Sequence, residues 1–200
     1  MKPRLTDADY ERAAAALDCD VPAVKAVAEV ESAGDGFLTD GRVKVLFEAA
    51  QFHKRTAGRF AAKRPDLSQP TWEGARKFYT RGSLADARGA GELKRLADAM
   101  ELDRGAALAS TSFGKFQIMG FNHRLCGYPE VEAFYTAMQE SEARQLAAFC
   151  EFVAFNASMH AALKAHAWAG FARAYNGPKY AENQYDLKLA KAWARHGGKP

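Results

Sequence analysis

One stretch of the chain alternates in the manner of a strand, and this feature limits the possible folds most. In FLTDGRVKVLFE, apolar side chains at Val43, Val45 and Phe47 are separated by single residues. A period of two is typical of a half-buried strand. The Asp40-Gly41 pair just before it is a strong signal for a tight turn. We therefore expect a small β-hairpin here, and we find no other convincing strand signal.

Most of the remaining sequence predicts helices. Thr6 and Asp9 resemble a capping box that opens a helix through about Leu17, and Asp20 with Pro22 opens a second one. The later helices are expected at about 47–56, 72–79, 92–101, within 130–166, up to 176 and at 180–195. The sequence thus predicts a mainly α fold with a small β-hairpin lobe, built as a single domain over residues 1–200.

Composition excludes several classes of protein. Hydrophobic residues make up 48% of the chain, which is enough for a packed core, and no apolar run is long enough to span a membrane. The net charge is only +4, its positive excess falls after Glu151, and no run of four Lys or Arg occurs. We expect a solvated helix face there, without a nucleic-acid partner and without stable membrane insertion.

The three cysteines, Cys19, Cys126 and Cys150, are far apart and show no metal-ligand spacing. We therefore expect buried thiols in a reduced compartment, with no metal site and no disulfide.

The N-terminal residues lack the apolar segment of a secretory signal peptide. We therefore expect the protein to accumulate in the cytoplasm.

A glutamate stands on the apolar side of the second predicted helix. Val24, Val27, Ala28 and Glu31 lie at i, i+3, i+4 and i+7, so they share one face. Burial and the negative end of the helix dipole both raise the pKa of a carboxyl group, which suits a general acid. Geometry alone favours another interpretation, a core-edge ion pair with Lys25 or a distant arginine.

Four separated segments resemble a known family. VESAGDGF, VKVLFEAAQFHKRT, SFGKFQIMGFN and FARAYNGPKYAENQYDLKLAKA are similar, in order and spacing, to segments of the phage-type N-acetylmuramidases. These are endolysin domains related to goose-type lysozymes and lytic transglycosylases. The resemblance covers roughly residues 10–195. It implies a lysozyme-like α-helical fold and hydrolysis of the β-1,4 bond between N-acetylmuramic acid and N-acetylglucosamine in peptidoglycan.

The resemblance also implies roles for individual residues. Glu31 corresponds to the general acid that protonates the leaving oxygen. The residues that it implies around the substrate are Ser112, Gln117, Met119, Tyr175 and Asn176. Phe113 departs from the pattern, because relatives often carry tryptophan before the glycine, so an indole contact is not expected there. The resemblance implies no metal and no cofactor.

The second carboxylate is left open by the residues. Asp35, Asp40 and Glu48 all lie in the segment that could face Glu31, and Glu48 is favoured because VLFE matches the family pattern. Each of two candidates has a competing interpretation. Glu48 would be a carboxylate stabilised at a helix N-terminus, and Asp40 would be a turn residue. An inverting glycosidase places its two carboxyl groups roughly 6.5–9.5 Å apart, and a retaining one about 5–5.5 Å apart.

Other functions fit parts of the same pattern. A lytic transglycosylase would use one acid/base glutamate and release an anhydromuramyl product, and a non-catalytic wall-binding module would not need a buried acid. A secreted antibacterial effector with this fold would have a similar sequence. We expect a monomer that acts on peptidoglycan glycan strands at the periplasmic cell wall after release from the cytoplasm.

Overall fold

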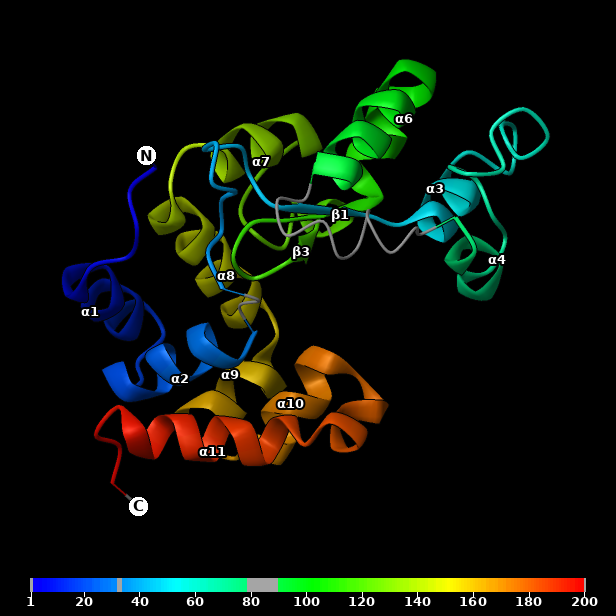
Figure 1. Cartoon of the computed structure of the whole chain (residues 1–200). Coiled ribbons are helices and arrows are strands. Elements are labelled where there is room, and N and C mark those ends of the chain that lie inside the picture. Colours follow the sequence, from blue (N-terminus) through cyan, green and yellow to red (C-terminus); the bar gives the residue numbers. More distant parts are fainter. Residues whose placement is uncertain (1, 32–33, 79–89, 200) are drawn as a thin grey trace.

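The structure is a computed structural model that describes residues 2–31, 34–78 and 90–199. Helices dominate these residues and surround a small sheet (Figure 1). The helices are α1 (Asp7–Ala16), α2 (Val21–Glu31), α3 (Ala49–Arg55), α4 (Trp72–Arg76), α6 (Ala90–Ala109), α7 (Val131–Met138), α8 (Glu142–Phe155), α9 (Ala157–Lys164), α10 (Trp168–Asn176) and α11 (Tyr185–Arg195), with the 3-10 helices η1 (Gly120–Asn122) and η2 (Pro178–Asn183). The mainly α prediction is confirmed.

Three short strands form an antiparallel sheet in the order β1-β2-β3. They are β1 (Val45–Phe47), β2 (Thr111–Phe113) and β3 (Ile118–Met119). The expected hairpin is only partly right, because residues 37 and 43 form a single bridge around the predicted turn while β1 pairs with β2. Strands β2 and β3 were not predicted from the sequence. All three residues of β2 are buried, so this strand shows no alternation of polar and apolar positions.

The predicted helix starts near the N-terminus are confirmed. Thr6 and Asp9 form a reciprocal capping box, and the Asp20 carboxylate accepts the Ala23 N–H at 2.8 Å. The last helix begins later than expected. Residues 178–183 form η2 instead, and Gln184 has a left-handed φ of 53°, which ends the 3-10 segment before α11 begins.

Two other predicted helices differ in length. The helix expected at 92–101 extends over the whole of α6, with Asp103 leaving helical geometry inside it. The Asp103 carboxylate accepts the Ala106 N–H at 2.9 Å and so caps the second half of the helix. The helix expected at 72–79 ends at Arg76, and Tyr79 lies outside the described residues.

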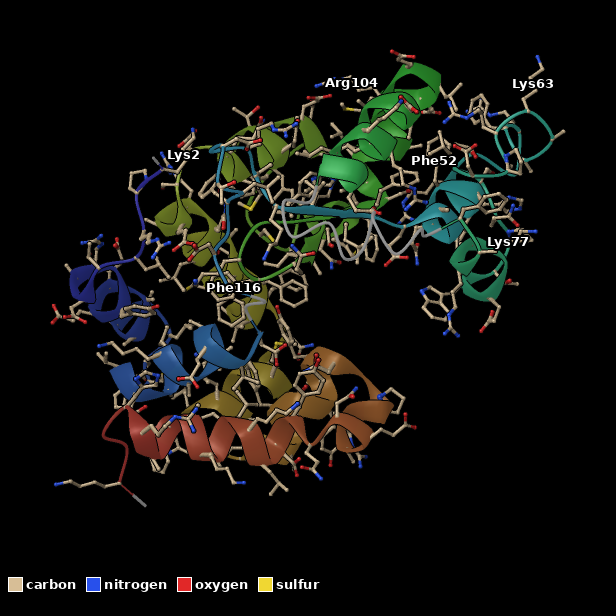
Figure 2. The ribbon with its side chains drawn as sticks, viewed as in Figure 1. Lys2, Phe52, Lys63, Lys77, Arg104 and Phe116 are labelled. Carbon is tan, nitrogen blue, oxygen red and sulfur yellow. The ribbon has the colours of Figure 1, made fainter. Side chains whose placement is uncertain are left out.

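The molecule has two sides joined by α8. One side holds α1, α2, α9, α10 and α11, and α11 runs along α2 and α10 (Figure 1). The other side holds the sheet with α3, α4, α6 and α7. Phe116 lies between the two sides in Figure 2, and its ring stacks on Phe149 of α8 with the centroids 4.6 Å apart. Burial of such aromatic rings stabilises this junction.

Helix α8 also joins the two sides through a buried amide. The Gln145 Oε1 atom accepts the Lys115 N–H at 2.7 Å, and its Nε2 atom donates to the carbonyl of Met138 at 2.8 Å. A Cβ atom added at Gly36 would lie 2.0 Å from Oε1, and one at Gly114 would lie 2.5 Å from the Gln145 side chain. Both glycines are therefore required for this close approach.

A buried carboxylate in the first turn of α8 reinforces this junction. Glu142 accepts the backbone N–H groups of Gly36 at 2.7 Å and Leu5 at 3.2 Å, and Lys115 lies 3.6 Å away. A buried carboxylate needs such partners, because an unpaired one costs several kcal/mol. The two polar side chains of α8 thus hold the segment after α2 against the turn between β2 and β3.

The three cysteines are free, and burial raises the pKa of the Cys126 and Cys150 thiols to about 12.

Among the described residues, no group of three or more His, Cys, Asp or Glu side chains could hold a metal ion. Within the same residues, no individual helix has the length and apolarity needed to cross a bilayer. The bent pair α8 and α9 meets that test jointly, by length and composition alone.

Candidate active site

A cavity of about 670 Å³ lies where the helical side meets the sheet side. Side chains from α2, α8, α10 and α11 approach it from one direction, and residues around the sheet approach it from the other. The lining residues are Glu31, Glu48, Phe116, Gln117, Ile118, Met119, Asn122, Phe152, Tyr175, Asn176 and Tyr185. Residues far apart in the sequence thus converge on one polar site.

Glu31 is the last residue of α2, and its helix explains its position. Val24, Val27 and Ala28 are buried on the same face, so the apolar packing of α2 carries the carboxyl group to the cavity. Burial raises the pKa of Glu31 above its usual range. The amide of Asn176 and the positive charge of Lys188 oppose part of this increase in pKa.

The partner of Glu31 is a neutral amide. The Nδ2 atom of Asn176 donates to Glu31 Oε1 at 2.9 Å. Lys25, the predicted alternative partner, pairs with Asp7 instead. No described Lys or Arg lies within ion-pair distance of Glu31. The interpretation as a core-edge ion pair is therefore wrong for the described residues, and the carboxyl group keeps a raised pKa.

Asn176 and Tyr175 end helix α10 beside this carboxyl group. Gly177 follows with a φ of 79°, which stops the helix there. The Tyr175 hydroxyl donates to the carbonyl of Phe116 at 3.0 Å, so α10 is held against the turn between β2 and β3. Burial, followed by the nearby charge of Glu31, raises the pKa of Tyr175 well above its usual value.

The turn between β2 and β3 contributes Gln117 and Met119 to the cavity wall. Gln117 has a left-handed φ of 47°, which is uncommon for a residue with a side chain. Its side chain holds this geometry, since Nε2 donates to the carbonyl of Gly114 at 2.8 Å and Oε1 accepts the Ser112 hydroxyl at 2.9 Å. Ser112 is buried behind Gln117 and does not line the cavity. It supports Gln117 from behind.

Glu48 lies on the sheet side of the cavity, directly after β1 and at the start of α3. Its N–H donates to the carbonyl of Ser110 at 2.9 Å. The preceding residue, Phe47, donates its N–H to the buried Glu92 carboxylate at 3.0 Å, and Arg95 contacts both Glu92 and the Phe47 carbonyl. The backbone that carries Glu48 is therefore fixed on both sides.

The other two candidate carboxylates lie elsewhere. Asp35 is exposed and pairs with Arg4 at 2.6 Å, and Asp40 pairs with Arg42 in the predicted turn at 2.6 Å. The hydrogen bonds from Arg42 hold the pKa of Asp40 below its usual range. Neither aspartate lines the cavity that contains Glu31. Glu48 alone among the three candidates shares that cavity.

Phe116 and Ile118 flank Gln117 in a segment that the family resemblance places at the cleft, but sequence reasoning missed three other lining residues, Asn122, Phe152 and Tyr185. Asn122 is the last residue of the SFGKFQIMGFN segment, so its inclusion could have been inferred from its neighbours. Phe152 belongs to the helical stripe of α8, where an aromatic residue on a half-buried face usually indicates core packing. Tyr185 opens α11 and carries no motif that distinguishes it. Ser32, which follows Glu31 in the resemblance, lies outside the described residues.

The helical body, the three-stranded sheet and the glutamate-lined cavity together define a lysozyme-like fold. The chain belongs to the N-acetylmuramidase family, because the model of the Muramidase family matches residues 20–197. Members of this family cleave peptidoglycan, and the predicted family resemblance is confirmed. A search of the curated proteins returned no match to the chain.

A solved structure agrees with this assignment. The chain is similar to the endolysin of the Burkholderia phage AP3, with 46% sequence identity and a TM-score of 0.85. The similarity covers 97% of this chain and 71% of the AP3 endolysin chain. The lysozyme-like fold expected from the sequence is thereby confirmed over nearly the whole chain.

Proposed function

We propose that the protein hydrolyses the β-1,4 bond between N-acetylmuramic acid and N-acetylglucosamine in peptidoglycan, with Glu31 as general acid. The observation that carries this proposal is the half-buried Glu31 carboxyl group in a glutamate-lined cavity, held by the Asn176 amide at 2.9 Å. Burial raises the pKa of this carboxyl group and so favours its protonated form, which can transfer the proton to the leaving oxygen.

Glu48 is the proposed second carboxylate. As the glycosidic bond breaks, positive charge develops on the sugar ring, and an ionised carboxylate across the cavity stabilises this charge. Its position at the N-terminus of α3 suits a negative charge, because the helix dipole is positive at that end. The competing interpretation of Glu48, a carboxylate stabilised at a helix N-terminus, is compatible with this role. The helix dipole that stabilises a carboxylate there also favours the ionised form that the proposed role requires.

The remaining lining residues are proposed to bind the glycan. Gln117, Met119, Tyr175 and Asn176 would contact the sugar units on either side of the cleaved bond, with Ser112 holding Gln117 in position. Residues 1–200 would act as one catalytic domain and as a monomer on peptidoglycan strands. In keeping with the similarity to an endolysin, the site of action would be the cell wall, reached after release from the producing cell.

Product analysis tests the reaction type. Purified peptidoglycan is digested with the wild-type protein and with Glu31→Gln, and the soluble fragments are analysed by mass spectrometry. Hydrolysis predicts fragments with a free reducing end, whereas anhydromuramyl ends would show that the protein is a lytic transglycosylase. Binding to the wall without any soluble product from the wild type would show that it is a binding module.

The configuration of the first-formed product tests the role of Glu48. Proton NMR of the released reducing end, recorded before the two anomers equilibrate, distinguishes inversion from retention. Inversion assigns Glu48 as the base that activates water, and retention assigns it as the nucleophile. Full activity of Glu48→Gln would refute both roles.

A further inference from the structure

A polar stripe leads from the cavity along helix α3. Glu48, Gln51 and Arg55 are separated by three and four residues, so they share one face of the helix. Glu48 lines the cavity, and Arg55 is seven residues further along. At 1.5 Å per residue this places Arg55 about 10 Å beyond Glu48 along the helix axis. Figure 1 shows α3 continuing outward from β1 on the sheet side.

An exposed aromatic ring meets the end of this stripe. The Arg55 guanidinium lies over the ring of Phe121, 4.6 Å from its centroid. Phe121 is 41% exposed, and two residues around it, Met119 and Asn122, line the cavity. The Arg55–Phe121 pair therefore continues the cavity wall. Exposed aromatic faces flanked by cations are suited to bind ligands with an apolar face and a negative charge.

Arg55 is a cation without an acidic partner in the described part of the chain. Its side chain donates to two acceptors of Gln51, the side-chain Oε1 atom at 2.7 Å and the backbone carbonyl at 3.4 Å. Its pKa is lowered by burial, so its charge is partly desolvated. A half-buried arginine with no carboxylate beside it is well placed to bind an anion.

We propose that Arg55 and Phe121 form a subsite for a carboxylate-bearing muramyl unit of the glycan strand. The ring of Phe121 would contact a sugar face, and the Arg55 guanidinium would bind a carboxylate of the attached lactyl or peptide group. This proposal rests on the proposed muramidase function and adds the part of the substrate that the cavity alone does not explain. It makes Arg55 a determinant of specificity for charged wall glycan over neutral glycan.

The structure also offers a matched control. Arg59 lies over the ring of Phe60, 5.2 Å from its centroid, four residues after Arg55 and beyond the end of α3. Arg59 pairs with Asp103 at 2.8 Å, so its charge already has a carboxylate partner. Phe60 and Arg59 do not line the cavity. Arg59→Gln therefore removes the same kind of contact without affecting the proposed subsite.

The test compares two soluble substrates, glycan strands that carry stem peptides and the same strands after their carboxylates are converted to neutral amides. Values of KM and kcat are measured for the wild type, Arg55→Gln, Arg55→Lys, Phe121→Leu and Arg59→Gln. Arg55→Gln is expected to raise KM about tenfold on the charged strands and to leave KM unchanged on the neutral ones. Arg55→Lys should keep part of the preference for charged strands, and Arg59→Gln should behave as the wild type.

Phe121→Leu separates the two parts of the subsite. Because the ring would contact the sugar and not the charge, this variant should raise KM similarly on both substrates. An equal effect of Arg55→Gln on charged and neutral strands would overturn the proposal and assign Arg55 a structural role. A wild-type protein that cleaves neither substrate would instead refute the proposed function, so the two failures are distinguishable.

Discussion

The two glutamates of the cavity are the same residue type in two different environments. Glu31 ends a helix on its apolar face, and its partner is the neutral amide of Asn176. Glu48 follows a strand at the start of a helix, on a backbone fixed by the Glu92–Arg95 ion pair. Desolvation favours the protonated form on the helical side, and the positive end of α3 favours a negative charge on the sheet side. The fold itself therefore separates the proposed roles of acid and anion.

The largest effect is expected when the helical side loses its acid. Glu31→Gln keeps the shape and a hydrogen-bonding group but cannot donate the proton, so kcat should fall by roughly a thousandfold or more. Release of reducing ends from peptidoglycan measures this, with circular dichroism as the check on folding. Activity within tenfold of the wild type would contradict the assignment of Glu31 as the acid.

Substitution of Glu48 on the sheet side is expected to lower kcat as much as substitution of Glu31, or less. The leaving group of the substrate distinguishes the two variants. Glu48→Gln should lower kcat by roughly a hundredfold or more, because the developing positive charge loses its partner. On a muramyl glycoside with a nitrophenol leaving group, which departs without protonation, Glu31→Gln should recover much of its activity and Glu48→Gln should not. Recovery of both variants to the same extent would show that the two glutamates do not have separate roles.

The support of Glu48 should matter for stability. Glu92→Leu removes the carboxylate of a buried ion pair, which also accepts the Phe47 N–H, so the free energy of unfolding should fall by about 3–5 kcal/mol. Urea unfolding followed by fluorescence measures this. The control is Glu29→Ala, which breaks an exposed pair with Arg195 and should cost under about 1 kcal/mol. Equal losses for the two variants would contradict the buried role of Glu92.

The smallest effect is expected from the amide beside Glu31. The Asn176 hydrogen bond stabilises the ionised carboxylate and so lowers the pKa of Glu31, against the larger effect of burial. Asn176→Leu should therefore raise this pKa further and move the alkaline limb of the kcat/KM profile to higher pH. Asn122→Leu replaces another amide of the same cavity and should leave the limb in place. A shift to lower pH in Asn176→Leu would contradict the sign of this contribution.

The sequence predicted the helical side of the site better than the sheet side. The periodicity of α2 placed Glu31 at the edge of the core, because helical spacing determines which residues share a face. Periodicity could not identify Asn176 as its partner, since 145 residues separate them and only the packed fold brings them together. The resemblance to the family implied Asn176 only as a residue of the site.

On the sheet side, local pattern was a poorer guide. The turn at Asp40 was correctly located, but β1 pairs with β2, which lies more than sixty residues later in the chain. A strand buried on both faces carries no alternation, so β2 gave no signal that could be distinguished from a core segment. The choice among Asp35, Asp40 and Glu48 likewise needed the tertiary fold, because each is a plausible carboxylate by position alone.

The close packing of Gln145 against Gly36 and Gly114 has a consequence for how this cavity could change during evolution. Two backbone segments approach one amide side chain at distances that only glycine permits, one segment shortly after α2 and the other in the turn between β2 and β3. Helix α2 ends at Glu31 and the turn carries Gln117, so a methyl group added at either glycine would push apart two segments that adjoin the active site. Substitutions at exposed positions such as Phe121 meet no such restriction, and they are the easier route to a changed substrate preference.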